Sequence, residues 1–104
     1  MILYLLRHGD AVESGFDDSS RPLSLPGEEQ AARVANVFSM LHLPLDAILS
    51  SPLVRAKQTA EIIGAALNGV KCDATEYLVP GTNEKQLFQQ LNEMRKQSVL
   101  LIGH

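Results

Sequence analysis

Three short apolar runs limit the folds open to this chain more than any other feature of its sequence. They occupy residues 2–6, 47–50 and 99–102, and each is continuous rather than alternating with polar residues. Continuous apolar runs of this length are typical of parallel strands that are covered on both faces. The sequence therefore predicts a buried, mainly parallel sheet.

The stretches between these runs have the spacing of helices that bury one face. A first helix is predicted over residues 26–41, with Ser24 as its N-cap. A second is predicted over residues 52–67, with Ser51 as its cap and Pro52 at its first position. The apolar residues expected to face inward are Ala31, Val34, Ala35, Phe38 and Leu41 in the first helix, and Ala56, Ala60, Ile63 and Leu67 in the second.

A weaker strand near residues 70–74 and a third helix over residues 83–96 complete an alternating order of strands and helices. That order predicts an α/β fold, a three-layer α/β/α arrangement around a mainly parallel sheet. With 104 residues we expect a single domain. Because the apolar run at 99–102 is followed only by Gly103 and His104, we expect the domain to lack its C-terminal part, or the chain to associate through the surface left exposed.

Composition excludes several classes of function. A net charge of −3 argues against nonspecific binding of nucleic acid, which needs a positively charged surface. No segment approaches the ~18 apolar residues of a membrane span, and the apolar opening meets Arg7 too soon to be a signal peptide. The single Cys72 cannot form an intramolecular disulfide. We therefore expect a cytoplasmic protein with neither nucleic-acid nor membrane partners.

The candidate catalytic and binding residues follow the predicted strands. Arg7 and His8 come at the end of the first strand, and Gly9 then permits a sharp turn or the close approach of a ligand. Arginine offers a planar fork of donors to phosphate, and histidine is a nucleophile near neutral pH. Arg55 lies in the first turn of the second helix, where anions are attracted, and His104 ends a strand at the same edge. These four side chains predict a phosphoryl-transfer pocket without a metal.

Four sequence motifs resemble those of the histidine phosphatase superfamily, also called the phosphoglycerate mutase-like family. Residues 6–11 (Leu-Arg-His-Gly-Asp-Ala) resemble its signature, residues 23–31 the start of its first helix, residues 50–60 its second motif, and residues 100–104 the strand that presents its second histidine. They occur in the family order along the whole chain. The acidic Asp10 and the segment 20–24 resemble the SixA-type phosphohistidine phosphatases most.

The resemblance implies a phosphoglycerate mutase-like fold and a phosphatase that needs neither metal nor other cofactor. His8 would attack phosphorus and carry the phosphoryl group, while Arg7, Arg55 and His104 stabilise its oxygens. The substrate would be phosphohistidine on a protein.

Two further residues take roles from the same resemblance. Arg21 would be a third phosphate-contacting arginine, and Glu76 is the candidate general acid in the loop after the third strand. The role of Glu76 matters less if the leaving group is an imidazole.

Two alternatives to this function stay open. The substrate could be a small phosphate ester or sugar phosphate, or the chain could be a non-catalytic phosphate-binding module. His42 is interpreted as a partner of the helix dipole at the end of the first helix. The three histidines have no metal-ligand spacing, so no zinc site is expected.

Overall fold

The computed structural model describes residues 1–13, 15, 17–79, 81 and 84–103. Four strands and three helices alternate along the chain: β1 (Ile2–Arg7), α1 (Leu25–Met40), β2 (Ala47–Ser50), α2 (Val54–Ala66), β3 (Cys72–Ala74), α3 (Glu84–Met94) and β4 (Ser98–Gly103). Two 3-10 turns lie between them, η1 (Asp18–Ser20) and η2 (Glu76–Leu78). The strands form one sheet in the order β1-β4-β2-β3, and each of these pairs is parallel.

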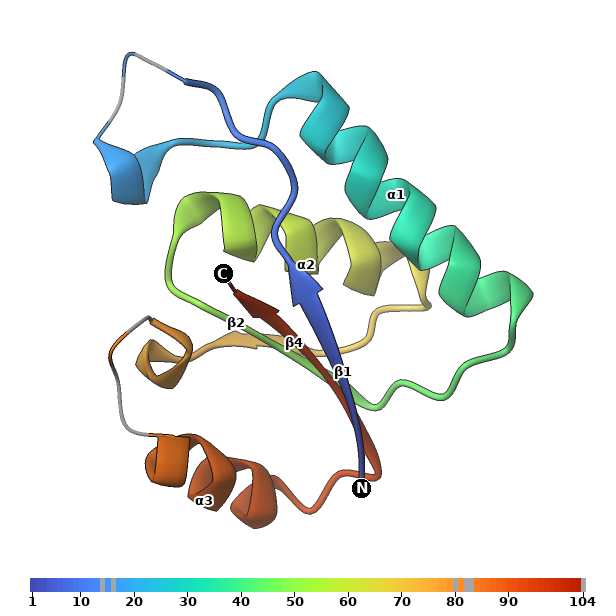
Figure 1. The fold of residues 1–104 in the computed structure, drawn as a ribbon. Helices are drawn as coiled ribbons and strands as arrows, with labels where there is room; N and C mark the ends of the chain where they lie inside the picture. The colour runs from blue at the N-terminus through green and yellow to red at the C-terminus, as the bar shows by residue number, and fades with distance from the viewer. Residues whose placement is uncertain (14, 16, 80, 82–83, 104) are drawn as a thin grey trace.

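The sheet is the middle of three layers, as predicted. Helices α1 and α2 cover one face and α3 covers the other (Figure 1). Successive residues of a strand point to opposite faces. Ile48, Leu100 and Ile102 therefore pack under α1 and α2, while Leu49, Val99 and Leu101 pack with Leu91 of α3.

The two helix starts differ in how well the sequence predicted them. Ser24 caps α1, because its Oγ accepts a hydrogen bond from the Gly27 N–H at 3.2 Å. The predicted cap of α2 at Ser51 is wrong. Ser51 still belongs to the sheet, since its N–H donates to the carbonyl of Ile102 at 2.9 Å, and α2 begins only at Val54.

The C-terminal end of α1 is a second correction. Leu41 was expected to face inward, but 63% of it is exposed. The helix ends at Met40, and the chain then turns through His42, whose φ is 51°. A residue beyond the last helical turn no longer follows the helical stripe, so the spacing does not place it in the core.

The first strand is also less covered than its apolar sequence predicts. β1 is an edge strand that pairs only with β4 among the described residues. Tyr4 and Leu6 pack against the core beneath α1 and α2, but Leu5 is 80% exposed. The strand expected to lack cover, residues 99–102, is instead central and buried between β1 and β2. The uncovered apolar surface therefore belongs to β1.

Candidate active site

The strand topology places Arg7 and His8 at the carboxyl edge of the sheet. Because all four strands are parallel, their carboxyl ends lie together, where ligands bind in folds of this kind. Arg7 ends β1 opposite Gly103 of β4. His8 follows, and its N–H donates to the carbonyl of Gly103 at 3.1 Å. His104, the next residue of the chain, lies outside the described residues.

Two hydrogen bonds define the protonation of the His8 ring. Its Nδ1 lies 2.8 Å from the carbonyl oxygen of Gly9, and its Nε2 lies 3.2 Å from Nε of Arg55. A carbonyl can only accept, so Nδ1 carries the proton. An arginine N–H can only donate, so Nε2 presents its lone pair. The contacts therefore select the neutral Nδ1–H form, in which Nε2 is the unprotonated ring nitrogen.

The loop around His8 is held by close backbone contacts with both covering helices. The Gly9 N–H donates to Oγ1 of Thr59 at 3.1 Å, and that hydroxyl donates to the carbonyl of Arg55 at 2.8 Å. On the other side, a Cβ on Gly9 would lie 2.7 Å from the carbonyl oxygen of Gly27. A side chain at Gly9 or at Gly27 would push the loop away from α1. The close contact of these two glycines therefore fixes the position of His8.

Two glutamines complete this support. Gln30 holds Asp10 twice, because its Oε1 accepts from the Asp10 N–H and its amide donates to the Asp10 carboxylate, both at 2.9 Å. Gln58 accepts from the Leu23 N–H at 2.7 Å. The sequence analysis quoted these residues within its motifs but gave them no role. The signal in the sequence was an amide side chain in the first half of each predicted helix.

Arg55 is buried at the start of α2 and engages Asp18, an acidic residue to which the sequence analysis gave no role. Only 4% of its side chain is exposed. Its Nη1 donates to the backbone carbonyl of Asp18 at 2.6 Å, and its Nη2 lies 3.4 Å from the Asp18 carboxylate. Asp18 also pairs with Arg21 at 2.8 Å. Hydrogen bonding from Arg21, and then the charge of Arg55, lower the pKa of Asp18.

Arg21 thus lies beside Arg55 through their shared partner, Asp18. It is further anchored by a hydrogen bond from its Nη1 to the Val12 carbonyl at 3.2 Å. The loop that precedes α1 therefore folds back over the start of α2 (Figure 1). This return places a second guanidinium next to the residue that contacts His8.

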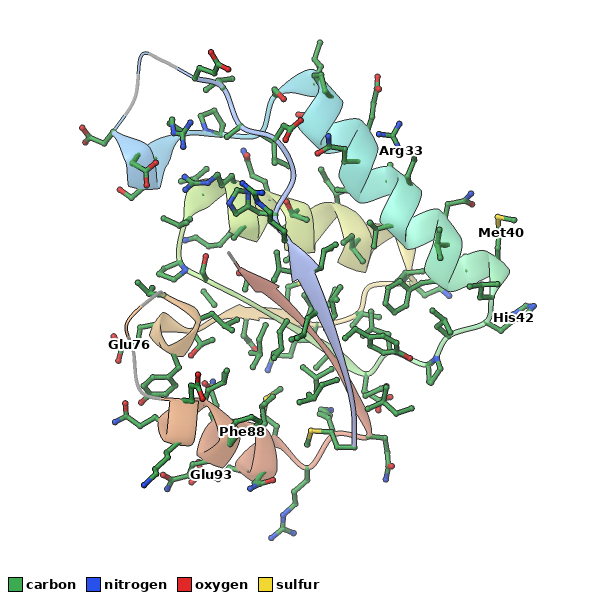
Figure 2. The ribbon with its side chains drawn as sticks, viewed as in Figure 1. Arg33, Met40, His42, Glu76, Phe88 and Glu93 are labelled. Carbon is green, nitrogen blue, oxygen red and sulfur yellow. The ribbon has the colours of Figure 1, made fainter. Side chains whose placement is uncertain are left out.

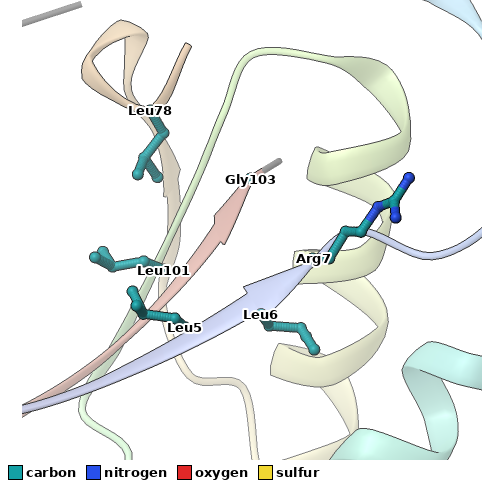
Figure 3. A pocket seen from close by; sticks show the side chains of 6 residues that line it. All are labelled: Leu5, Leu6, Arg7, Leu78, Leu101 and Gly103. Atoms are coloured by element: carbon teal, nitrogen blue, oxygen red, sulfur yellow. The ribbon is translucent and has the colours of Figure 1, made fainter. Parts of the chain in front are cut away.

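Arg7 is exposed at the end of β1 and lines two hollows. One, of about 240 Å³, is also lined by Leu5, Leu78 and Leu101, which gather on the face of the sheet opposite Leu6 (Figure 3). The other, of about 210 Å³, is shared with His8 and lies between β1 and the two covering helices. Arg7 and His8 thus face a common space at the carboxyl edge.

Glu76 lies in the turn that follows β3, and its role as general acid stays a prediction. It begins η2 directly after β3 and is exposed on the outer side of that turn (Figure 2). β3 and β1 are the two edge strands, three steps apart in the sheet. The turn η2 nevertheless returns toward the carboxyl edge, because Leu78 lines the same hollow as Arg7 and Gly103.

The remaining predicted groups lie away from the site or form no cluster. His42 sits beyond the C-terminal end of α1 (Figure 2), whereas His8 is held near the N-terminal end of that helix. Within the described part of the chain, no three His, Cys, Asp or Glu side chains are placed to hold a metal ion. Within the same residues, no helix has the length and apolar character needed to cross a membrane.

Comparison with known proteins identifies the family. A family model for branch 1 of the histidine phosphatase superfamily matches residues 3–99. The chain belongs to this superfamily. The match confirms the resemblance on which the sequence analysis relied, and its residues span both supporting helices and the Arg7-His8 pair.

Individual relatives of the superfamily are more similar to parts of the chain than to its whole length. An uncharacterised protein of Picosynechococcus is 42% identical over 82 residues, covering 77% of this chain and 50% of that protein. The phosphohistidine phosphatase SixA of Escherichia coli is 37% identical over 68 residues, covering 65% of this chain and 42% of SixA. The chain thus spans about half the length of these curated relatives.

The fold agrees more completely. A solved structure of the protein histidine phosphatase SixA in complex with tungstate matches with a TM-score of 0.87 at 31% identity, covering 100% of this chain and 69% of that one. The three-layer parallel fold predicted from the sequence is therefore the fold of a histidine phosphatase.

Proposed function

We propose that this protein is a phosphohistidine phosphatase in which Nε2 of His8 is the nucleophile. The observation that carries the proposal is the tautomer of His8. Gly9 holds the proton on Nδ1, and Arg55 marks Nε2 as the atom with the lone pair. A neutral imidazole held in this way needs no separate base before it attacks phosphorus.

The reaction would proceed in two displacements. His8 Nε2 forms a bond to phosphorus while the bond from phosphorus to the substrate imidazole breaks, and that imidazole leaves with its bonding electron pair. Water then attacks the phosphohistidine intermediate, releasing inorganic phosphate and restoring His8. Arg7, Arg55, Arg21 and His104 would stabilise the equatorial oxygens, where charge spreads in the transition state.

The need for a general acid distinguishes the two candidate substrates, and it favours phosphohistidine over a phosphate ester. An alkoxide leaving group needs a proton from a general acid, whereas a protonated phosphohistidine releases neutral imidazole. Glu76 takes no step in this proposal, because a neutral imidazole leaves without a proton from a general acid. Asp18 is held ionised by Arg21 and Arg55 and has no proton to donate. Small phosphate esters are therefore expected to be poor substrates.

The proposed partner is a protein that carries phosphohistidine, and the proposed setting is the cytoplasm. The relative in complex with tungstate is a protein histidine phosphatase, and tungstate is a tetrahedral dianion like phosphate. This supports an oxyanion site at the same edge of the sheet. The catalytic edge of this chain is open along β1, where Arg7 is exposed, so a side chain projecting from another protein has access.

A trapping experiment tests the nucleophile. The protein is mixed with a histidine-phosphorylated protein, quenched in base to preserve phosphohistidine, and mapped by mass spectrometry. We expect the label on His8, no label or turnover in His8→Ala, and normal turnover in His42→Ala, which alters a histidine distant from the site. A label on another residue, or turnover by His8→Ala, would contradict the assignment. Turnover should persist in EDTA, and its loss there would overturn the metal-free mechanism.

A further inference from the structure

The carboxylate of Asp18 lies between the two arginines that the proposed function assigns to phosphate. Its Oδ1 is 2.8 Å from Nη2 of Arg21, and its Oδ2 is 3.4 Å from Nη2 of Arg55. Two oxygens of one anion thus contact two guanidiniums at once. Two oxygens of a phosphoryl group bound at this edge would make the same kind of contact.

The contacts of Arg55 show which interaction a ligand would replace. Its Nε–H donates to His8, its Nη1 donates to the Asp18 backbone, and its Nη2 contacts the Asp18 carboxylate. The carboxylate contact is the longest of the three, and the Asp18 side chain is 72% exposed. The backbone bond, at 2.6 Å, can remain while the carboxylate is exchanged for another anion.

We propose that Asp18 is an internal competitor of the phosphoryl group for Arg55 and Arg21, and that it thereby sets which anions the site accepts. The inference depends on the proposed phosphate site. Without substrate, the Asp18 carboxylate keeps the two guanidiniums converged. Substrate binding transfers them from the carboxylate to phosphoryl oxygens. Because the ligand must displace one negative charge, a tetrahedral dianion gains from the exchange, whereas a monoanionic carboxylate or sulfate ester does not.

The competition is expected to hold over the whole working pH range. Arg21 and Arg55 lower the pKa of Asp18 below its ordinary value of 3.8. A carboxyl whose pKa is lowered stays charged above that ordinary value and is neutralised only as the pH falls through the lowered one. Asp18 should therefore carry its charge at both pH 5 and pH 8.

Calorimetric titration with inorganic phosphate tests the proposal independently of turnover. Asp18→Asn keeps the size and an acceptor oxygen but removes the charge, and Asp17→Asn removes the same charge from the neighbouring exposed residue. We expect Asp18→Asn to bind phosphate about fivefold more tightly than Asp17→Asn, the effect of one unit charge at about 4 Å in water. Asp18→Glu restores the charge and should bind like the wild-type protein. Acetate should bind measurably only to Asp18→Asn.

Each other result has a distinct meaning. Phosphate binding by Asp18→Asn that is equal to or weaker than binding by Asp17→Asn overturns the competitor role and leaves the phosphatase proposal intact. Failure of every variant, including the wild-type protein, to bind phosphate refutes the oxyanion site and both proposals with it. If Asp18→Asn does not fold, judged by circular dichroism, the comparison of Asp18→Glu with Asp17→Asn decides: tighter binding by Asp18→Glu overturns the proposal.

Discussion

Replacing Gly27 with alanine tests the close contact that holds the catalytic loop against α1. A Cβ at this position would overlap the carbonyl oxygen of Asp10 and lie 3.0 Å from its carbonyl carbon. The opposing atoms are backbone, so they cannot rotate away as a flexible side chain would. The loop must therefore move, and it carries His8 two residues before Asp10.

Two effects of opposite sign decide the magnitude. Alanine is favoured over glycine inside a helix by about 1 kcal/mol. Overpacking a tight contact costs about 1–3 kcal/mol, and a contact this short belongs at the upper end. The clash should win by about 2 kcal/mol. For a domain of this size that net loss lowers the Tm by roughly 8 °C.

Urea unfolding followed by circular dichroism measures the change, and Ala32→Gly on the exposed face of α1 provides the matched control. The control isolates helix propensity and should cost about 1 kcal/mol. Gly27→Ala should lose stability and also turnover, because the loop that carries His8 is displaced. If Gly27→Ala instead gains about what Ala32→Gly loses, propensity alone governs this position, and the argument from close approach is refuted.

Three further changes give separate predictions. Thr59→Val should lower the free energy of unfolding by about 1–3 kcal/mol, because it leaves the buried Gly9 N–H without its acceptor. Thr59→Ser keeps the hydroxyl and should retain both stability and turnover. Equal losses in the two variants would contradict this prediction. Ser51→Ala should raise the free energy of unfolding by about 1 kcal/mol in urea titrations, since the Ser51 hydroxyl is buried without a partner among the described residues; a loss would show that it has one. Leu5→Lys should change the free energy of unfolding by less than about 0.5 kcal/mol, because Leu5 is so exposed. It should also reduce self-association, measured by sedimentation. Unchanged association would show that the chain does not associate through the β1 edge.

Local patterns in the sequence predicted the elements of the fold well. The run at 47–50 coincides with β2, and the helical spacing at 26–41 matches α1 to within one residue at each end. Strand and helix periodicity depend on neighbouring residues, which the sequence displays directly. The start of α2 was misplaced because a serine before proline is a helix-start signal, yet here the backbone of Ser51 still pairs with Ile102 of β4.

The order of strands in the sheet could not be read in the same way. β1 and β4 have similar apolar sequences, but one is an exposed edge and the other is central and buried. Which strand lies at an edge depends on pairing between residues almost the whole chain apart, such as Ile2 with Ser98. An apolar run predicts a strand but does not show how many neighbours that strand has.

The site residues also differ in whether local sequence could predict them. Arg7, His8 and Arg55 were identified from motifs, and the structure brings His8 and Arg55 into contact. Asp18 was missed because its importance depends on a loop folding back to a residue 37 positions later. No local signal distinguishes it from Asp17, its equally acidic and exposed neighbour. Contact with a distant arginine is what separates a site residue from a solvated one.

The strand that precedes the proposed nucleophile also carries exposed apolar side chains. β1 ends in Arg7 and is followed by His8. Among the described residues, it is supported at one edge, by β4, and on one face, by α1 and α2. On its other face, Leu5 opens onto the hollow that Arg7 also lines (Figure 3). In a longer domain we would expect a further segment to cover this face, since the curated relatives are about one and a half times as long as this chain. Such a segment would border Arg7 directly, so the part of the domain that stabilises β1 would also shape access to the phosphoryl group.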